Sequence, residues 1–91
     1  MKVKFFATYR DITRRKEEDV PAPPDISALL ADLGSRYGTA FKTKLYTSDG
    51  LEIGEETIIL VNGRNVHHLS GIKTKLSETD VVSVFPVVAG G

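Results

Sequence analysis

The sequence predicts a single α+β domain in which a mixed sheet of about five strands carries one main helix packed on one face. Three observations support this. Several short segments have the alternating or β-branched pattern of strands, one stretch has the 3.6-residue periodicity of an amphipathic helix, and turn residues separate these segments. Because one helix can cover only one face of a sheet, a doubly wound fold with helices on both faces is excluded.

Length and composition agree with one small domain. The chain has 91 residues, of which 41% are hydrophobic and 26% charged, a balance typical of a folded globular protein. Twelve Lys and Arg residues balance twelve Asp and Glu residues, so nonspecific binding to nucleic acids or anionic membranes is disfavoured. The absence of cysteine excludes disulfides, a cysteine nucleophile and Cys-based metal sites.

Targeting signals are not evident in the sequence. The apolar stretch near the N-terminus ends at Tyr9-Arg10-Asp11, too soon for the core of a signal peptide. The most apolar stretch, residues 81–89, is broken by Ser83 and Pro86 and is too short to span a bilayer. We therefore expect a cytoplasmic protein.

Two strands are expected before the first proline. Between Lys2 and Thr8, apolar and polar side chains alternate with the period of two that a half-buried strand requires. Phe6 breaks this alternation and is predicted to point out of the other face of the sheet. A shorter strand is predicted over Glu17–Val20, where the carboxylate run Glu17-Glu18-Asp19 would discourage pairing at an exposed edge.

One amphipathic helix is predicted over residues Ile26 to Tyr37. Asp25 is placed to cap its first turn, Gly38 is placed to end it, and Asp32 and Arg36 are spaced as an i, i+4 ion pair on the solvent side. The apolar face predicted to cover the sheet consists of Ile26, Leu29, Leu30, Leu33 and Tyr37.

The connection from Thr39 to Glu56 is predicted to be irregular, with room for a short helical turn. Its apolar residues are expected at the edge of the core; they are Phe41, Leu45, Tyr46 and Leu51.

Three more strands follow. Thr57–Val61 is continuously apolar and β-branched, as in a strand covered on both faces, and Asn62-Gly63 predicts a hairpin turn into a return strand over Arg64–Val66. The last strand, Val81–Phe85, ends at Pro86. The order strand, strand, helix, strand, strand, strand is that of a β-grasp layout.

Most sequence motifs of catalysis are missing. There is no phosphate-binding glycine loop and no nucleophile elbow. The only histidines, His67 and His68, are adjacent and would point to opposite sides of an extended chain, and no third ligand lies nearby. We interpret them as surface histidines and expect no metal site.

The C-terminus is the most informative segment. After Pro86, the tail Val87-Val88-Ala89-Gly90-Gly91 could extend about 17 Å from the domain. Glycines without Cβ suit a narrow tunnel, so the tail is predicted to enter a partner's active site, with Gly91 presenting its carboxylate as the reactive group. A partner would form an acyl-adenylate from that carboxylate and ATP, and a sulfur donor would then displace AMP to leave a thiocarboxylate.

Four segments carry a family resemblance. They are residues 3–12, the hairpin 60–66, Leu76 with Asp80-Val81-Val82, and the ending 84–91. With these segments the chain resembles the MoaD/ThiS family of ubiquitin-like sulfur carriers, and most of all the small subunits of molybdopterin synthase. A glycine often precedes the family's aspartate; here the residue before Asp80 is Thr79.

The resemblance implies a fold and a set of partners. The last strand would be central and parallel to the first, Gly91 would be adenylated and thiocarboxylated, and residues Val87, Val88, Ala89 and Gly90 would insert into the partner. The partners would be an E1-like adenylating enzyme, which uses the ATP, and the large subunit of molybdopterin synthase. The chain itself would bind no cofactor and act as a non-catalytic carrier, or as the small subunit of that sulfurtransferase.

A docking surface is predicted beside the tail. With the parallel pairing of the first and last strands that the resemblance implies, strand parity places Phe85 next to Phe6 on the face that the helix leaves open, and two adjacent outward aromatic rings are typical of an interface. Arg10, Arg64 and Lys73 could add polar contacts at its rim.

Three other functions remain open on the sequence. The same acyl-adenylate could end as an isopeptide bond to a lysine, which would make the chain a ubiquitin-like protein modifier. The sulfur could serve another pathway, such as thiamine or cysteine synthesis. A β-grasp interaction domain with an inert tail is the third alternative.

Overall fold

The computed structural model describes residues 1–50 and 52–87. Within them the helices and strands follow one another in the order β1 (Lys2–Phe5), α1 (Thr8–Thr13), β2 (Glu17–Asp19), α2 (Ile26–Tyr37), α3 (Thr39–Leu45), β3 (Thr57–Val61), β4 (Arg64–Asn65), the 3₁₀ helices η1 (Val66–His68) and η2 (Gly71–Lys73), and β5 (Val81–Pro86).

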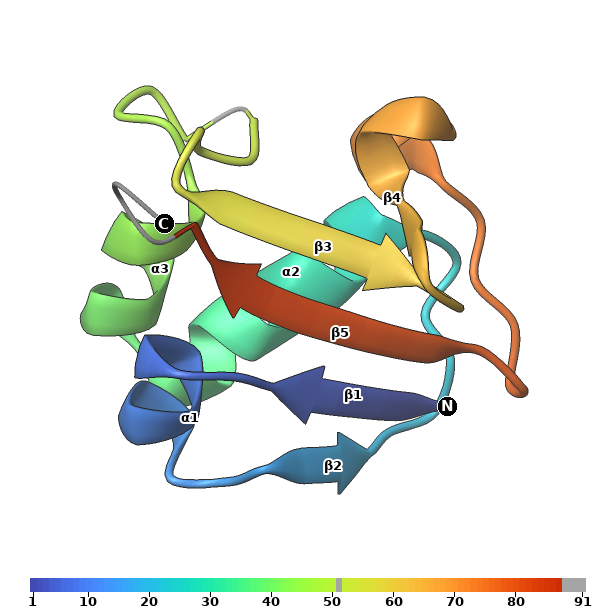
Figure 1. Ribbon diagram of the computed structural model, residues 1–91, viewed down its shortest axis with the longest axis horizontal. Helices are drawn as coiled ribbons and strands as arrows, with labels where there is room; N and C mark the ends of the chain where they lie inside the picture. Colours follow the sequence, from blue (N-terminus) through green and yellow to red (C-terminus); the bar gives the residue numbers. More distant parts are fainter. Residues whose placement is uncertain (51, 88–91) are drawn as a thin grey trace.

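The five strands form one mixed sheet in the order β2-β1-β5-β3-β4 (Figure 1). The central pair, β1 and β5, is parallel, and the other pairs are antiparallel. The first and last strands of the chain are therefore neighbours in the middle of the sheet, as the resemblance implies.

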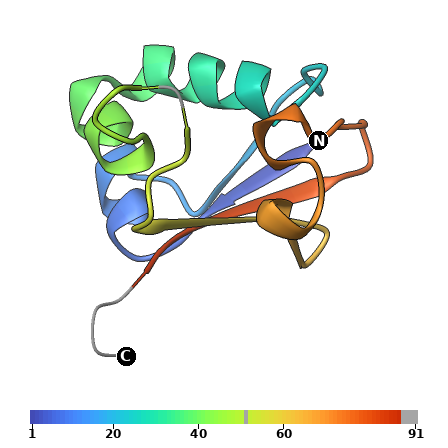
Figure 2. The same cartoon turned by 90° about the horizontal axis from the view of Figure 1, so that it is seen from above.

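Helices α2 and α3 lie on one side of the sheet (Figure 2). In β1, β3 and β5 alternate side chains are buried beneath this layer, which is the pattern of a sheet covered on one face. The predicted α+β layout is confirmed. The opposite side chains of these strands are half-buried, and none of the described helices covers them; we call this side the open face. Largest among the fully buried side chains are Tyr9, Phe5, Phe41, Ile26, Leu29, Leu30 and Leu33.

The main helix begins and ends where its caps predict. The Asp25 side chain accepts a hydrogen bond of 2.9 Å from the backbone N–H of Ala28, and Gly38 follows the helix with a φ of 85°. The predicted ion pair is present, with 3.3 Å between Nε of Arg36 and Oδ2 of Asp32.

The edge strand β2 is tied to the helix layer through Glu18. Its carboxylate pairs with Arg36 and accepts a hydrogen bond from the Tyr37 hydroxyl. Glu18 therefore faces the helix, while Glu17 forms a 3.0 Å ion pair with Lys2. The carboxylate run does lie on an edge strand, and one of its members also binds a neighbouring element.

The first strand is shorter than predicted. It ends at Phe5, and after Ala7, whose φ is 51°, the chain forms helix α1. The predicted strand ran too far, to Thr8, because helix α1 was not recognised. The two buried residues of α1, Tyr9 and Thr13, are one helical turn apart but stand among polar residues.

The segment after α2 is more regular than predicted. Residues Thr39–Leu45 form α3, and Phe41 and Leu45 are fully buried in the core instead of lying at its edge. Tyr46 is half-buried and forms a bridge with Ile53, whereas Leu51 lies outside the described residues. Helix α3 is short and carries two lysines, and its two buried apolar residues are too few for the helical periodicity to be recognised in the sequence.

The hairpin turn is confirmed, with positive φ at both Asn62 and Gly63. The return strand is shorter than predicted, because Val66 begins η1 and the Asn65 side chain accepts a hydrogen bond from the backbone N–H of His67. Strand β5 extends one residue beyond the prediction, to Pro86.

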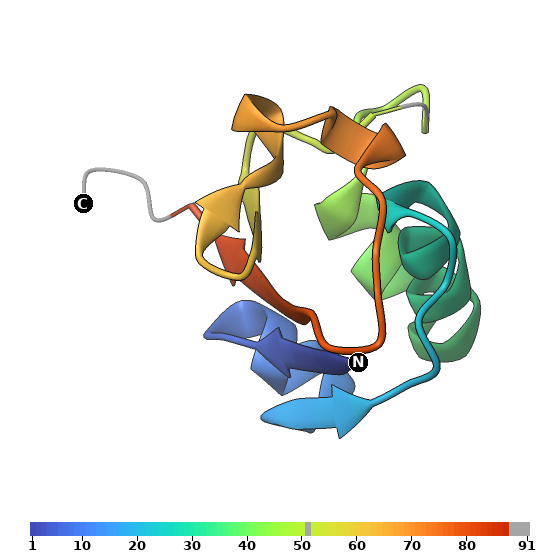
Figure 3. The ribbon, with the colours of Figure 1, turned by 90° about the vertical axis from the view of Figure 1, so that its right-hand side faces the viewer.

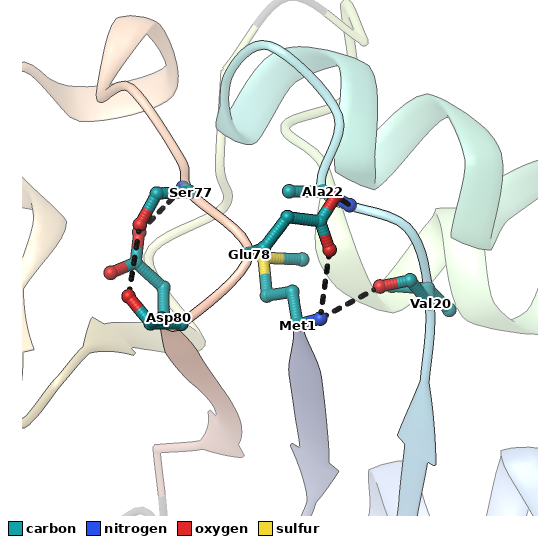
Figure 4. Close-up of polar contacts among 7 residues, drawn as sticks. Met1, Val20, Ala22, Ser77, Glu78 and Asp80 are labelled. Carbon is teal, nitrogen blue, oxygen red and sulfur yellow. Dashed lines mark hydrogen bonds and ion pairs between the residues drawn. The ribbon is translucent and has the colours of Figure 1, made fainter.

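The N-terminal end of β1 is held by a polar cluster (Figure 4). The Met1 ammonium donates to the carbonyl of Val20 at 3.0 Å and lies 3.5 Å from Oε2 of Glu78. The other carboxylate oxygen of Glu78 accepts a 2.9 Å hydrogen bond from the backbone N–H of Ala22. Figure 3 shows that the N-terminus, the chain that follows β2 and the turn before β5 meet at one end of the domain.

Asp80 closes the turn that leads into β5. Its carboxylate accepts hydrogen bonds from the backbone N–H of Ser77 at 2.8 Å and from the side-chain amide of Asn62 at 2.9 Å. These bonds, the one from Asn62 foremost, lower the pKa of Asp80. Thr79 is not among the residues with positive φ, so this turn does not require the glycine that the family often has there.

Candidate functional site

The candidate site begins where β5 leaves the sheet. Pro86 lies opposite Thr57 of β3, and the backbone N–H of Val87 donates a 2.7 Å hydrogen bond to the carbonyl of Glu56. The Val87 side chain is 46% exposed, which is unusual for a large apolar residue in this domain. The predicted tail residues Val88, Ala89, Gly90 and Gly91 lie outside the described residues.

Two aromatic rings lie next to this exit on the open face. The Phe6 and Phe85 rings are stacked, with their centroids 4.1 Å apart and their planes 8° from parallel. The register explains the contact: Phe5 is paired with Val84, and the N–H of Phe6 donates to the carbonyl of Val84 at 3.1 Å. Both rings therefore leave neighbouring strands on the same side, as strand parity predicts.

Apolar side chains of β3 extend this surface. Ile58 lies directly opposite Phe85, and Leu60 lies opposite Ser83; both side chains are half-buried. We call Phe6, Phe85, Ile58 and Leu60 the exit patch. An apolar patch that adjoins a chain exit is suited to contact with another protein.

A buried hydrogen-bond network supports the exit from the helix side. The Thr57 hydroxyl donates to the carbonyl of Lys44 at 3.1 Å, and the oxygen atoms of the Tyr9 and Thr57 hydroxyls are 2.5 Å apart. Because threonine has one hydroxyl proton, Tyr9 must be the donor in the second bond. Burial raises the pKa of Tyr9, which keeps this phenol protonated as a donor.

The two predicted rim arginines lie in different regions. Arg10 is an exposed residue of α1, which packs near the exit, whereas Arg64 of β4 pairs with Val61 at the opposite end of β3 (Figure 1). Lys73 is exposed in η2, which packs against α2 and η1. A partner would have to cover the length of β3 to reach both arginines.

The histidines are placed in η1, where His67 and His68 are both exposed. In the described part of the chain no group of three or more His, Cys, Asp or Glu side chains is arranged to hold a metal ion. None of the helices in residues 1–50 and 52–87 has the length and apolar character needed to cross a membrane.

Comparison with known proteins decides the family. Residues 3–91 match the ThiS family. The chain is 34% identical over 97 residues to Small archaeal modifier protein 3 of Haloferax volcanii, with 100% of this chain and 98% of that protein covered. The chain belongs to the ThiS family.

Two further relatives of this ThiS-family chain carry different descriptions. It is 44% identical over 66 residues to a putative sulfur carrier protein of Archaeoglobus fulgidus, a match that covers 72% of this chain and 73% of that protein. The structure of a putative molybdopterin converting factor, subunit 1, of Pyrococcus furiosus superposes with a TM-score of 0.75 at 31% identity, covering 96% and 95% of the two chains. The ThiS-family chain is thus a ubiquitin-like protein of the sulfur carrier and modifier group.

Some features of the site were missed in the sequence. Tyr9 and Thr57 were not singled out, although Tyr9 and Thr13 have helical spacing and Thr57 starts a strand of otherwise apolar residues. A hydroxyl in such a strand requires a buried partner, which could have pointed to Tyr9.

Proposed function

We propose that this chain is a sulfur carrier whose terminal carboxylate, on Gly91, is adenylated by an E1-like enzyme and converted to a thiocarboxylate. The observation that supports it most is the position of the exit: β5 leads the chain out of the sheet at Val87, beside the stacked rings of Phe6 and Phe85. Membership in the ThiS family supports the same function.

The proposed chemistry has two steps. A carboxylate oxygen of Gly91 attacks the α-phosphorus of ATP in the partner, forming the acyl-adenylate and releasing pyrophosphate. Hydrosulfide then attacks the acyl carbon, the bond from that carbon to the AMP oxygen breaks, AMP leaves, and the thiocarboxylate remains. ATP is bound by the partner, so the chain itself acts as a carrier, and the need for ATP leads us to place the reaction in the cytoplasm.

The docking roles follow from the site geometry. Phe6 and Phe85 would form the centre of the interface, since central aromatic side chains contribute most of the binding energy in protein complexes. Arg10 would contact the rim near the exit and Arg64 the far end of β3. Residues Val87, Val88, Ala89 and Gly90 would occupy the entrance to the partner's active site.

The recipient that we propose is a molybdopterin precursor, bound by the large subunit of molybdopterin synthase. The similarity to the putative molybdopterin converting factor of Pyrococcus furiosus supports this recipient. Mixing the thiocarboxylated chain with that large subunit and its pterin precursor should return the carboxylate form. If the thiocarboxylate persisted in this mixture but was consumed in thiamine or cysteine synthesis, the proposed recipient would be wrong and the sulfur would be assigned to that other pathway.

Intact-mass measurement tests the carrier function directly. The chain is incubated with the E1-like enzyme of the same organism, ATP and sulfide, and we expect one oxygen to be replaced by one sulfur. A variant lacking Gly91 should show no change, while Lys75→Met, altered at an exposed side chain on the helix side, should react like the unmodified chain. An unchanged mass of the unmodified chain in the presence of active enzyme would refute the proposal.

A second function is favoured by one observation, the full-length similarity to Small archaeal modifier protein 3. The same acyl-adenylate would then react with a lysine amine to form an isopeptide bond. Mass spectrometry of trypsin-digested cell proteins should reveal lysines that carry residues 76–91, because Lys75 is the last residue of the chain after which trypsin cleaves. If such lysines are found only when Gly91 is present, the chain is a modifier; if none is found, this second function is rejected.

A further inference from the structure

Lys4 occupies a distinctive place on the open face. It is the β1 residue between Lys2 and Phe6 on this side of the sheet, and it is half-buried. Across the strands it is paired with Ser83 of β5, which in turn lies opposite Leu60 of β3. Lys4 therefore lies next to Phe6 of the exit patch and is separated from Leu60 by Ser83.

Lys4 has no ion-pair partner in the part of the chain that the structure describes. Glu17 is its direct neighbour on β2, but Oε2 of Glu17 lies 3.0 Å from Nζ of Lys2 and makes its ion pair there. Among residues 1–50 and 52–87, no carboxylate forms an ion pair with Lys4. Lys2 thus has an intramolecular partner, and Lys4 depends on water.

Docking on the exit patch would remove this water. A protein that covers both Phe6 and Leu60 also covers the half-buried Lys4, which lies beside Phe6 and is separated from Leu60 by Ser83 alone. A lysine ammonium that loses its hydration without gaining a partner is costly, so an apolar surface alone would bind this face poorly.

The segment that follows β1 is positively charged. The stretch from Thr8 to Lys16, which continues from β1, has four cationic residues and a single acidic one, Asp11; the cations are Arg10, Arg14, Arg15 and Lys16. Side chains of all four are exposed. A partner that also contacted this segment would be complementary to it if it carried negative potential there.

We propose that the E1-like enzyme places a carboxylate against Lys4 beside its apolar contact with the exit patch, and that Lys4 is a specificity determinant for this enzyme. The inference rests on the proposed function and names the chemistry of its partner. An acidic side chain at this point would select chains with a cation at position 4 and reject chains with an apolar or acidic residue there.

Binding measurements with substitutions at Lys4 test this inference. The dissociation constant of the full chain and the E1-like enzyme is measured by titration calorimetry at low and high salt. Lys4→Met keeps most of the length of the unbranched side chain but removes its charge, and we expect about tenfold weaker binding, as for an interfacial charge pair that loses one member. Lys4→Glu should bind more weakly still, and Lys4→Arg should bind within a few-fold of the unmodified chain.

The control carries the same charge change elsewhere. Lys75 is exposed, and its backbone bridges to Asp25 at the start of α2 on the helix side. Lys75→Met should bind as the unmodified chain does. Far-ultraviolet circular dichroism and thermal unfolding would confirm that each variant is folded.

The outcomes separate the two proposals. Weaker binding of Lys4→Met with normal binding of Lys75→Met supports the inference. Equal or tighter binding of Lys4→Met would overturn the inference, because the enzyme would then present a neutral surface opposite Lys4. Equal weakening by Lys4→Met and Lys75→Met would also overturn it, because the effect would then come from the net charge of the chain. If the unmodified chain does not bind the enzyme at all, the proposed function fails and the inference with it.

Discussion

The hydroxyl oxygen atoms of Tyr9 and Thr57 lie 2.5 Å apart inside the domain, on the side of the sheet opposite the exit patch. This contact joins α1 to the start of β3, and Thr57 also bonds α3 through the Lys44 carbonyl. Three elements are therefore held together at the position where the chain turns away from the sheet at Pro86.

Substitutions at these two residues should differ in cost. Tyr9→Phe removes the donor of one bond and leaves the Thr57 proton bonded to Lys44, so we expect a loss of about 1 kcal/mol in the free energy of unfolding. Thr57→Val leaves both the Tyr9 hydroxyl and the Lys44 carbonyl without this partner and should cost about 2–3 kcal/mol. Urea titration measures both values, and equal losses would contradict the assigned donor.

The stacked rings should matter more for binding than for folding. Phe6→Ala and Phe85→Ala each remove one ring from the half-buried stack, and we expect about 10- to 30-fold weaker binding to the E1-like enzyme for each. The measurement is the dissociation constant, with Lys75→Ala as the control. The role of the exit patch would be refuted if both variants stayed folded and bound normally.

Acid should weaken the contact between β2 and α2. Partial burial raises the pKa of Glu18, but its bonds with Tyr37 and Arg36 outweigh burial and hold the pKa below its ordinary value. A carboxylate with a lowered folded pKa stabilises the fold above its unfolded pKa of about 4.3, and this contribution is lost as the pH falls through the folded pKa.

The melting temperature between about pH 5 and pH 3 measures this loss. Glu18→Gln should show a smaller decrease over that range than the unmodified chain. Glu52→Gln alters an exposed carboxylate that forms no ion pair within the described residues, and it should keep the full decrease. Identical curves for the two variants would rule out the contribution assigned to Glu18.

Alkaline conditions should affect the same cluster. Burial, and then the hydrogen bond to Glu18, raise the pKa of Tyr37 to about 12. Because the folded pKa exceeds the unfolded value of about 10, the stabilisation is complete below pH 10 and is lost as the pH rises through about 12. Ultraviolet titration of tyrosinate should show this late ionisation, absent in Tyr37→Phe. If the Tyr37 titration of Glu18→Gln coincided with that of the unmodified chain, the Glu18 carboxylate would have no influence on the pKa of Tyr37.

The predictability of the fold depended on the length and regularity of each pattern. The helix from Ile26 to Tyr37 was predicted with correct ends because it has several apolar residues in register and caps at both ends. Helix α1 was missed because it has six residues and only two are fully buried. Such short helices are stabilised by tertiary contacts, here by the bond from Tyr9 to Thr57, which no local pattern records.

The candidate site was likewise predictable only in part. Adjacency of Phe6 and Phe85 could be predicted, since parity within each strand and parallel pairing together determine it. The ion-pair partner of Glu17 could not be predicted from the sequence. Lys2 and Lys4 both lie on the strand that pairs with β2, and only the side-chain geometry shows that Glu17 pairs with Lys2. The isolation of Lys4 is therefore a result of the structure.

The pairing of the first strand with the last has a consequence for how the protein is made. Lys2 is paired with Val81, so nearly the whole chain separates the two members of the central contact. Topologies dominated by such distant contacts fold slowly, and here the middle of the sheet cannot close until synthesis has passed Pro86. A polypeptide that stops before β5 lacks both the central strand and the Gly91 carboxylate that we propose to be the reactive group, so incomplete translation products should remain unfolded and be degraded instead of competing with full chains for the proposed partner.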